Sequence, residues 1–176
     1  MQTHYDANAF ASLLNQLADG IAALVDLGKP FNVVGIRTRG ELLSERLVPI
    51  LQQRGAAEIG VGSLDITLYR DDLSEIGPLP LIRPTQLRFD IDKRPLILID
   101  DVLFTGRTVR AALDQLADFG RPSVVRLVVM VDRGGRELPI TADVSALKIE
   151  LPLSQQVKVK VASRDGEDGI DIVGRS

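Results

Sequence analysis

The sequence contains no cysteine and no tryptophan, and its only histidine is His4. Without cysteine the chain can form no disulfide, and no thiolate can serve as nucleophile or metal ligand. We expect His4 to lie in a frayed terminus, because it is only four residues from the start. A serine- or cysteine-type catalytic triad is therefore excluded, and a histidine general base is not expected.

Long apolar runs are also missing, since no stretch approaches the roughly 18 residues of a membrane helix. The first ten residues lack the basic and apolar regions of a signal peptide. The net charge is only −3, so nothing in the charge balance demands nucleic acid as a partner. We expect a single cytoplasmic domain over residues 1–176 that does not contact the membrane, because this length supports one real core.

The most informative stretch covers residues 96–114. It opens with four aliphatic residues, 96–99, which are typical of a fully buried parallel strand. Asp100 and Asp101 follow, and then a turn with the sequence TGRT at residues 105–108. Apolar residues recur at helical spacing from residue 109 onward. The sequence therefore predicts a strand, an acidic pair, a polar turn and a helix.

This order of elements suits a sugar phosphate. The start of a helix presents unpaired backbone N–H groups and the positive end of the helix dipole, which together bind phosphate. Gly106 would let the backbone approach the phosphate, Thr105 and Thr108 could donate hydroxyl hydrogen bonds, and Arg107 would add charge. Carboxylates at the strand end would then accept hydrogen bonds from a polyol such as ribose.

Spacing distinguishes among known phosphate loops. The Walker pattern and the G-x-G-x-x-G dinucleotide pattern are both missing from this stretch. An aliphatic strand, two acidic residues and T-G-[RK]-T match the phosphoribosyl pyrophosphate (PRPP) motif instead. The competing interpretation is a strand that ends in a solvated acidic turn, followed by an ordinary helix cap.

The rest of the chain alternates between strand and helix patterns. We expect a first helix from near Asp6 or Asn8 to Gly28, and a second helix that ends near Arg54 and is kinked or restarted at Pro49. Strands are expected at residues 32–36, 59–69, 124–131 and 157–161, the last as a half-exposed edge, and Gly120 should end the third helix. This alternation predicts an α/β fold with a mainly parallel twisted sheet and helices on both faces.

Residues 70–94 show no clear periodicity and contain three prolines. A loop of this length in a compact domain is usually functional or mobile. We interpret it as a lid, with room for a small hairpin, that closes over PRPP and excludes water. Arg70 would reach the pyrophosphate as the lid closes. The alternative is a disordered surface loop.

Several blocks of sequence resemble the PyrR family of bacterial pyrimidine operon regulators with uracil phosphoribosyltransferase activity. The blocks occur in the family's order and are GIRTRG (35–40), DITLYRDDLS (65–74), the central motif, FGRPSVV (119–125) and VDRGGRELPI (131–140). The resemblance implies a type I phosphoribosyltransferase fold with a flexible lid and a small hood. It also implies the reaction of uracil with PRPP to give UMP and pyrophosphate. Two alternatives remain: a UMP- or UTP-sensing regulator with little or no catalysis, and a phosphoribosyltransferase for another base.

The resemblance also assigns roles to residues of this chain. Asp100 and Asp101, with Arg39 and Arg70, would be catalytic, and residues 105–108 would bind the phosphate of PRPP or UMP. Mg²⁺ would enter with PRPP and be held mainly by substrate and water rather than by a protein cage. The remaining assignments are pyrophosphate binding by Thr38, Arg39, Gly40 and Arg70, and a base pocket with Phe104, Asp132 and Arg133.

PyrR proteins also bind pyrimidine (pyr) leader mRNA, which requires basic surface because phosphate contacts dominate RNA affinity. The first helix offers no lysine or arginine before Lys29, which argues against RNA binding by that helix. Purine enzymes that share the motif often carry an acidic residue directly before the threonine, where it can contact the base. This chain has Phe104 at that position, which favours a pyrimidine substrate. The resemblance further implies a homodimer or homotetramer.

Overall fold

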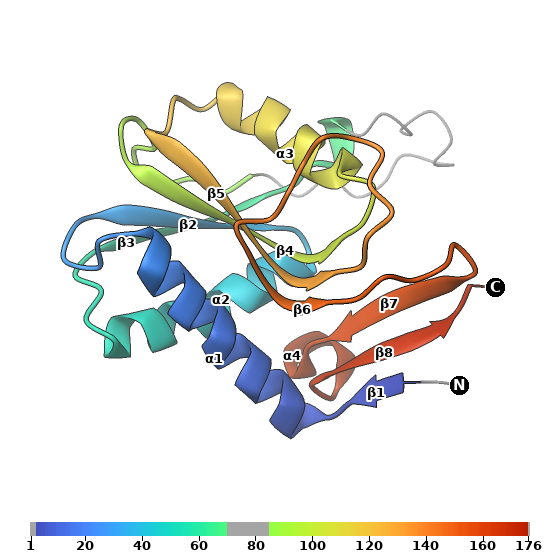
Figure 1. Cartoon of the computed structure of the whole chain (residues 1–176). Helices are drawn as coiled ribbons and strands as arrows, with labels where there is room; N and C mark the ends of the chain where they lie inside the picture. The colour runs from blue at the N-terminus through green and yellow to red at the C-terminus, as the bar shows by residue number, and fades with distance from the viewer. Residues whose placement is uncertain (1–2, 70–84, 176) are drawn as a thin grey trace.

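The computed structural model describes residues 3–69 and 85–175, and Figure 1 shows how its elements are arranged. In chain order the elements are β1 (Thr3–Tyr5), α1 (Ala7–Leu24), β2 (Phe31–Ile36), α2 (Arg39–Gln53), β3 (Ile59–Leu64), the 3₁₀ helix η1 (Thr67–Tyr69), β4 (Pro95–Leu103), α3 (Arg107–Ala117), β5 (Val124–Asp132), β6 (Val144–Lys148), β7 (Gln155–Lys160), α4 (Ala162–Asp165) and β8 (Gly169–Gly174).

Five strands form a parallel sheet in the order β3-β2-β4-β5-β6. Strand β4 is at the centre, where Ile99 pairs with Gly35 of β2 on one side and Val128 of β5 on the other. The side chains of residues 96–99 are fully buried. A strand covered on both faces needs no polar alternation, which explains the unbroken aliphatic sequence.

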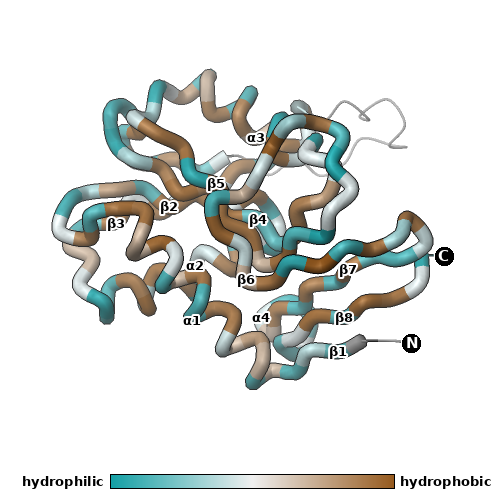
Figure 2. Tube along the Cα trace, viewed as in Figure 1, coloured by the Kyte–Doolittle hydropathy of each residue, from teal (hydrophilic) through white to brown (hydrophobic). Residues whose placement is uncertain are grey.

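The core lies on both faces of this sheet because successive β4 side chains point to opposite sides. Ile97 and Ile99 pack with the buried faces of α1 and α2, whereas Leu96 and Leu98 pack with α3. Figure 1 shows α3 on one side of the sheet and α1 and α2 on the other. Figure 2 shows the apolar residues concentrated along the sheet strands. The predicted parallel sheet with helices on both faces is confirmed.

A smaller antiparallel sheet forms from the two ends of the chain in the order β1-β8-β7. We call this sheet, with α4, the hood. Ile170 of β8 pairs with Tyr5 of β1 and with Val159 of β7. Strand β7 is an edge strand, as its alternating sequence predicts. The prediction of a frayed terminus at His4 was wrong, because His4 lies in β1 and its Nδ1 is 2.6 Å from an Asp171 carboxylate oxygen.

Two strand boundaries differ from those expected. Strand β4 continues to Leu103, so Asp100 and Asp101 lie within the strand rather than after it. The reason is tertiary, because β4 remains paired with β5 as far as Leu103 and Asp132. Strand β3 ends at Leu64, and the last three residues of the predicted strand 59–69 form η1 instead.

The first helix begins as predicted but ends earlier. Asp6 is its N-cap and accepts a hydrogen bond from the Ala9 N–H at 2.9 Å. The helix stops at Leu24, and Val25 is already extended. The Asp26 carboxylate accepts the N–H of Gly28 at 3.0 Å, so a local turn replaces the last predicted helical residues.

The other two long helices also differ in detail. Helix α2 runs without interruption through Pro49, so no restart occurs there. Helix α3 ends at Ala117, three residues before Gly120, which has a φ of 150°.

The predicted lid lies partly outside the described residues. Arg70 and the rest of residues 70–84 belong to that part. In the described part, Gln86 forms an antiparallel bridge with Ser63, and Ile91 is buried against the α3 side of the sheet. Within residues 3–69 and 85–175, no helix has the length and hydrophobicity needed to cross a membrane.

Candidate active site

The carboxyl ends of β2, β4 and β5 meet at one edge of the parallel sheet. Residues 37–40 follow β2, residues 104–108 follow β4, and residues 133–136 follow β5. Because β2, β4 and β5 are direct neighbours, these three segments lie side by side. Ligands of open α/β sheets bind at this edge.

The first component is the turn that begins α3. Gly106 is the N-cap and has a left-handed φ of 94°. The Thr105 hydroxyl oxygen accepts the Arg107 N–H at 3.3 Å, and Arg107 Nε donates to Glu137 at 2.8 Å. Thr108 is half-buried in the first helical turn. Because the first N–H groups of a helix have no intrahelical acceptor, this turn offers the donors that a phosphate needs.

The second component is the acidic pair, whose two members differ in environment. Asp100 is 5% exposed, and its carboxyl group accepts the Asp101 N–H at 2.9 Å. Burial, followed by the charge of Asp101, raises the pKa of Asp100 well above its usual value. Asp101 is half-buried and lines a cavity of about 500 Å³. One carboxyl group is therefore inside the protein, and the other is on the cavity wall.

The third component is the start of α2, which places Arg39 on the same cavity as Asp101. Helix and strand approach closely here, because a Cβ atom on Gly40 would lie 2.3 Å from a β4 carbonyl oxygen. Thr38 is the N-cap but makes no side-chain capping bond, and the peptide bond between Arg37 and Thr38 is cis. The close approach, which only glycine allows, sets the position of Arg39.

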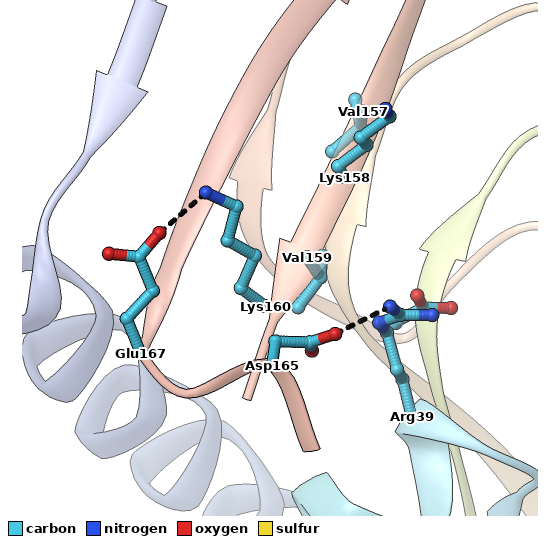
Figure 3. Close-up of a pocket in the computed structure, with 8 residues that line it drawn as sticks. Arg39, Val157, Lys158, Val159, Lys160, Asp165 and Glu167 are labelled. Carbon is cyan, nitrogen blue, oxygen red and sulfur yellow. Dashed lines mark hydrogen bonds and ion pairs between the residues drawn. The ribbon is translucent and has the colours of Figure 1, made fainter. Parts of the chain in front are cut away.

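The hood forms the opposite wall of the cavity, through residues 157–160 of β7 together with Asp165 and Glu167. Figure 3 shows Arg39 facing Asp165, and Lys160 facing Glu167. The two pairs are joined at 3.0 Å and 2.6 Å. The cavity therefore lies between sheet and hood and carries side chains of both signs.

The loop after β5 is held by its own ion pair. Arg136 donates to both carboxylate oxygens of Asp132, at 2.6 and 2.7 Å, and the Gly134 N–H donates at 3.1 Å. Burial acts to raise the pKa of Asp132, but these hydrogen bonds and the Arg136 charge outweigh it and lower the pKa. A smaller cavity of about 220 Å³ adjoins Asp132, Gly134 and Arg136.

Arg133 connects this loop to the hood. Its side chain is 3% exposed, and its guanidinium donates to the carbonyl oxygens of Leu151, Pro152 and Gln155 at 2.9, 3.3 and 2.9 Å. The guanidinium also lies 4.0 Å from the centroid of the Phe104 ring. The segment that leads into β7 is thereby fixed to the edge of the parallel sheet.

Comparison with known proteins agrees with this arrangement. Residues 2–165 match the family model described as the phosphoribosyl transferase domain. The chain belongs to the phosphoribosyltransferase family. Two relatives, each named bifunctional protein PyrR, place it in the PyrR group of that family. The protein from Deinococcus deserti is 53% identical over 140 residues, which cover 80% of this chain and 76% of the relative. The protein from Elusimicrobium minutum is 42% identical over 168 residues, which cover 96% and 94%.

Solved structures support the type I phosphoribosyltransferase fold. The HGPRT-ase of Leishmania tarentolae in complex with GMP aligns over 97% of this chain and 94% of its own, with a TM-score of 0.68. Its sequence identity is 15%, so this likeness concerns the fold alone. The resemblance to the PyrR family that the sequence motifs indicate is confirmed by the relatives.

Within this phosphoribosyltransferase fold, the predicted residues differ in whether they reach the central cavity. Arg39 and Asp101 line the central cavity, with the phosphate turn 105–108 at the same sheet edge. Asp132 and Arg133 are at that edge too, but their side chains already bind other protein groups. Arg70 lies outside the described residues.

Sequence reasoning missed the hood side of the site. Lys158 and Asp165 line the cavity, but neither was assigned a role. The alternation of valine with Lys158 and Lys160 predicts a half-exposed edge strand, and β7 is an edge strand. The alternation does not indicate which groups the lysines face. Asp165 is 126 residues from Arg39, and no local pattern could indicate their contact.

The donor groups present fit a magnesium ion shared with substrate. In the described ranges, no group of three or more histidine, cysteine or acidic residues could hold a metal. Asp101 nevertheless places a carboxylate on the cavity wall beside Arg39. One carboxylate together with phosphate oxygens and water is a usual magnesium environment.

Proposed function

We propose that this PyrR-family chain transfers ribose 5-phosphate from PRPP to N1 of uracil, with UMP and pyrophosphate as products. The supporting observation is one cavity between sheet and hood that joins Arg39 to Asp101, with the Gly106 turn at the same edge. The relatives at 53% and 42% identity are both named bifunctional protein PyrR, and uracil is the base that the resemblance to this family implies.

In this proposal each part of PRPP has its own binding element. The 5′-phosphate binds the N–H groups and hydroxyls of residues 105–108, and Asp101 accepts hydrogen bonds from the ribose hydroxyls. Pyrophosphate binds Thr38, Arg39 and Gly40, with Arg70 joining from outside the described residues. The bond from ribose C1 to pyrophosphate breaks, the bond to uracil N1 forms, and the N1 proton passes to the leaving pyrophosphate.

The charges on the site suit this reaction, because the sugar carbon becomes cationic as pyrophosphate leaves. A raised pKa favours the neutral form of Asp100, which leaves Asp101 as the main source of negative potential toward the sugar. Arg39 stabilises the leaving group. Magnesium bound by PRPP oxygens, water and Asp101 would neutralise further charge on the pyrophosphate.

For the base, we propose that uracil lies where the turn after β4, with Phe104, meets the loop after β5, with Asp132 and Arg133 at its start. The side chains of Asp132 and Arg133 already make ion pairs and hydrogen bonds within the protein. Backbone groups of that loop and of β7 are therefore expected to provide most of the hydrogen bonds to the base. Phe104 would shield the base from water, because its ring is half-buried and held by Arg133.

The test is pyrophosphate release from PRPP and Mg²⁺ in the presence of uracil, hypoxanthine or orotate. We expect release with uracil that exceeds release with either other base at least tenfold. Release with hypoxanthine or orotate but not uracil would indicate a phosphoribosyltransferase for another base. UMP binding by calorimetry without release for any base would indicate a nucleotide-sensing regulator instead.

We also propose UMP-dependent binding to the leader mRNA of a pyrimidine operon, because the relatives are named bifunctional protein PyrR. Helix α1 carries Asp19 as its only charged residue, so we expect other surfaces to contact the RNA. A salt titration should show tighter binding to the leader than to scrambled RNA, and UMP should strengthen it. Equal affinity for both RNAs would refute the regulatory role.

We further propose that residues 1–176 form one domain that assembles as a homodimer or homotetramer. Sedimentation equilibrium measures the assembly directly, and a monomer at micromolar concentration would contradict it.

A further inference from the structure

A carboxylate of the hood contacts the arginine that we assign to pyrophosphate. Asp165, the last residue of α4, accepts a hydrogen bond from Arg39 Nη2 at 3.0 Å. The side chains are 19% and 34% exposed, and both line the 500 Å³ cavity. Figure 3 shows this pair reaching across the cavity from opposite walls.

Asp165 is itself held firmly. Its second carboxylate oxygen accepts the Val161 N–H at 2.8 Å. Gly166 follows with a left-handed φ of 80°, which turns the chain back toward β8. The Val161 hydrogen bond, assisted by the Arg39 charge, lowers the pKa of Asp165 below its usual value despite partial burial. The carboxylate is therefore a fixed and ionised acceptor at neutral pH.

Arg39, in contrast, is only partly bound by other protein groups. Asp165 engages one terminal nitrogen, while Nε is buried and has no hydrogen-bond partner among the described residues. A guanidinium is a rigid planar fork, so a partner at one nitrogen fixes the direction of the others. The remaining N–H groups are thus held in one orientation before any anion arrives.

We propose that Asp165 is a positioning residue that holds Arg39 in the orientation that receives pyrophosphate. This inference rests on the proposed function, because it takes Arg39 as the pyrophosphate ligand. Fixing an arginine in advance can improve anion affinity by up to about thirtyfold, since its rotamer entropy is already lost. The Asp165 carboxylate also repels the anion, by about fivefold per charge at 4 Å in water and by more in a half-buried cavity. Positioning and repulsion act in opposite directions on pyrophosphate affinity, so the sign of the change on removing the carboxylate decides between them.

The chain offers a closely matched control in Asp168. This hood residue also binds an arginine of α2, Arg46, with contacts of 3.1 Å, and it also accepts a backbone N–H, from Ala162 at 2.8 Å. It does not line the cavity. Loss of Asp168 removes the same kind of hood-to-helix contact without touching Arg39.

The primary measurement is calorimetric binding of magnesium pyrophosphate, which needs no turnover. We expect Asp165→Ala to weaken it about fivefold. Asp165→Asn should weaken it less, because its amide oxygen can still accept from Arg39, although its NH2 group then faces the Val161 N–H. Asp168→Ala should stay within about twofold. UMP affinity should not change in any of these variants, because UMP carries no pyrophosphate.

A double-mutant comparison tests whether Asp165 acts through Arg39. Arg39→Ala combined with Asp165→Ala should bind pyrophosphate no more weakly than Arg39→Ala alone. In turnover, Asp165→Ala should raise the KM for PRPP or lower kcat, and leave the KM for uracil unchanged.

Three outcomes would overturn the proposal. Tighter pyrophosphate binding by both Asp165 variants would mean that the carboxylate only neutralises Arg39. Equal effects of Asp165→Ala and Asp168→Ala would mean a purely structural role, and a wild-type protein that binds no pyrophosphate would remove the ligand itself. If the wild type binds pyrophosphate normally but releases none from PRPP with uracil, the proposed enzyme function fails while the positioning of Arg39 is still measured.

Discussion

We expect replacement of Arg133 by methionine to loosen the attachment of the hood to the parallel sheet. Arg133 is nearly inaccessible to water, and its guanidinium binds three carbonyl groups in the segment 151–155 that leads into β7. Methionine preserves most of the side-chain volume and can still contact the Phe104 ring. The substitution therefore removes the donors and the charge with little loss of packing.

The contacts allow the cost to be estimated. Two hydrogen bonds of 2.9 Å from a charged donor are worth about 1.5–3 kcal/mol each. The contact with the Phe104 ring, at 4.0 Å, adds about 1 kcal/mol. The thioether recovers some packing and the freed carbonyls can regain water, so we expect a net loss of about 3 kcal/mol in the free energy of unfolding. For a chain of this length, that corresponds to a Tm lower by about 6–12 °C.

Urea unfolding followed by circular dichroism measures this loss, since the chain has no tryptophan to report by fluorescence. Arg126→Met is the control. Arg126 forms an ion pair with Asp143 at 3.0 Å, but its side chain is 42% exposed, so its loss should cost less than about 1 kcal/mol. An equal effect of the two substitutions, or a loss below about 1 kcal/mol for Arg133→Met, would refute the assignment of Arg133 as the main hood attachment.

Three further predictions concern the sheet edge. Gly40→Ala places a Cβ atom 2.3 Å from the Ile99 carbonyl oxygen, so denaturant unfolding should show a loss of about 2 kcal/mol, with slower pyrophosphate release. Thr105→Val removes a hydroxyl from the phosphate turn and should weaken UMP about tenfold in calorimetry; unchanged affinity would show that the phosphate binds elsewhere. The raised pKa of Asp100 means that the folded wild type binds more protons than its unfolded chain, so the stability of the wild type falls as pH rises above about 4. Asparagine does not titrate and removes this loss. Asp100→Asn should therefore stabilise the unliganded protein by an amount that increases with pH. Parallel pH–stability curves for the wild type and Asp100→Asn would contradict this.

Much of the fold could be predicted from local sequence. The unbroken aliphatic run at residues 96–99 predicts a buried strand, and these side chains are buried. Asp6 is a residue type that commonly caps helices, and it caps α1. The extension of β4 through Asp100 and Asp101 could not be predicted in this way. Two carboxylates usually mark the end of a strand, and only pairing with β5 shows that the strand continues.

The site was predictable on the sheet side and not on the hood side. Arg39 follows β2 and Asp101 lies near the carboxyl end of β4, and the carboxyl ends of neighbouring parallel strands necessarily meet. Asp165 reaches the same cavity through the packing of an antiparallel sheet built from both ends of the chain. Arg133 was predicted to be near the base, but its hydrogen bonds to backbone carbonyls depend on the path of the chain after β6, which has no sequence pattern.

The contacts that join the hood to α2 and to the sheet edge differ in burial, and this determines where the cavity can respond to substrate. Arg133 is buried, so salt hardly screens its hydrogen bonds, whereas the Arg46–Asp168 pair has an arginine side chain that is 41% exposed and is readily screened. The Arg39–Asp165 pair lies on the cavity, where pyrophosphate would share the guanidinium with Asp165 rather than displace it. PRPP binding should therefore reduce the mobility of the α4 end of the hood, because Asp165 of α4 contacts Arg39. The segment held by Arg133 is already fixed and should change little. Hydrogen exchange of the α4 backbone should slow with PRPP much more than exchange in the segment 151–155, and the reverse order would contradict this division.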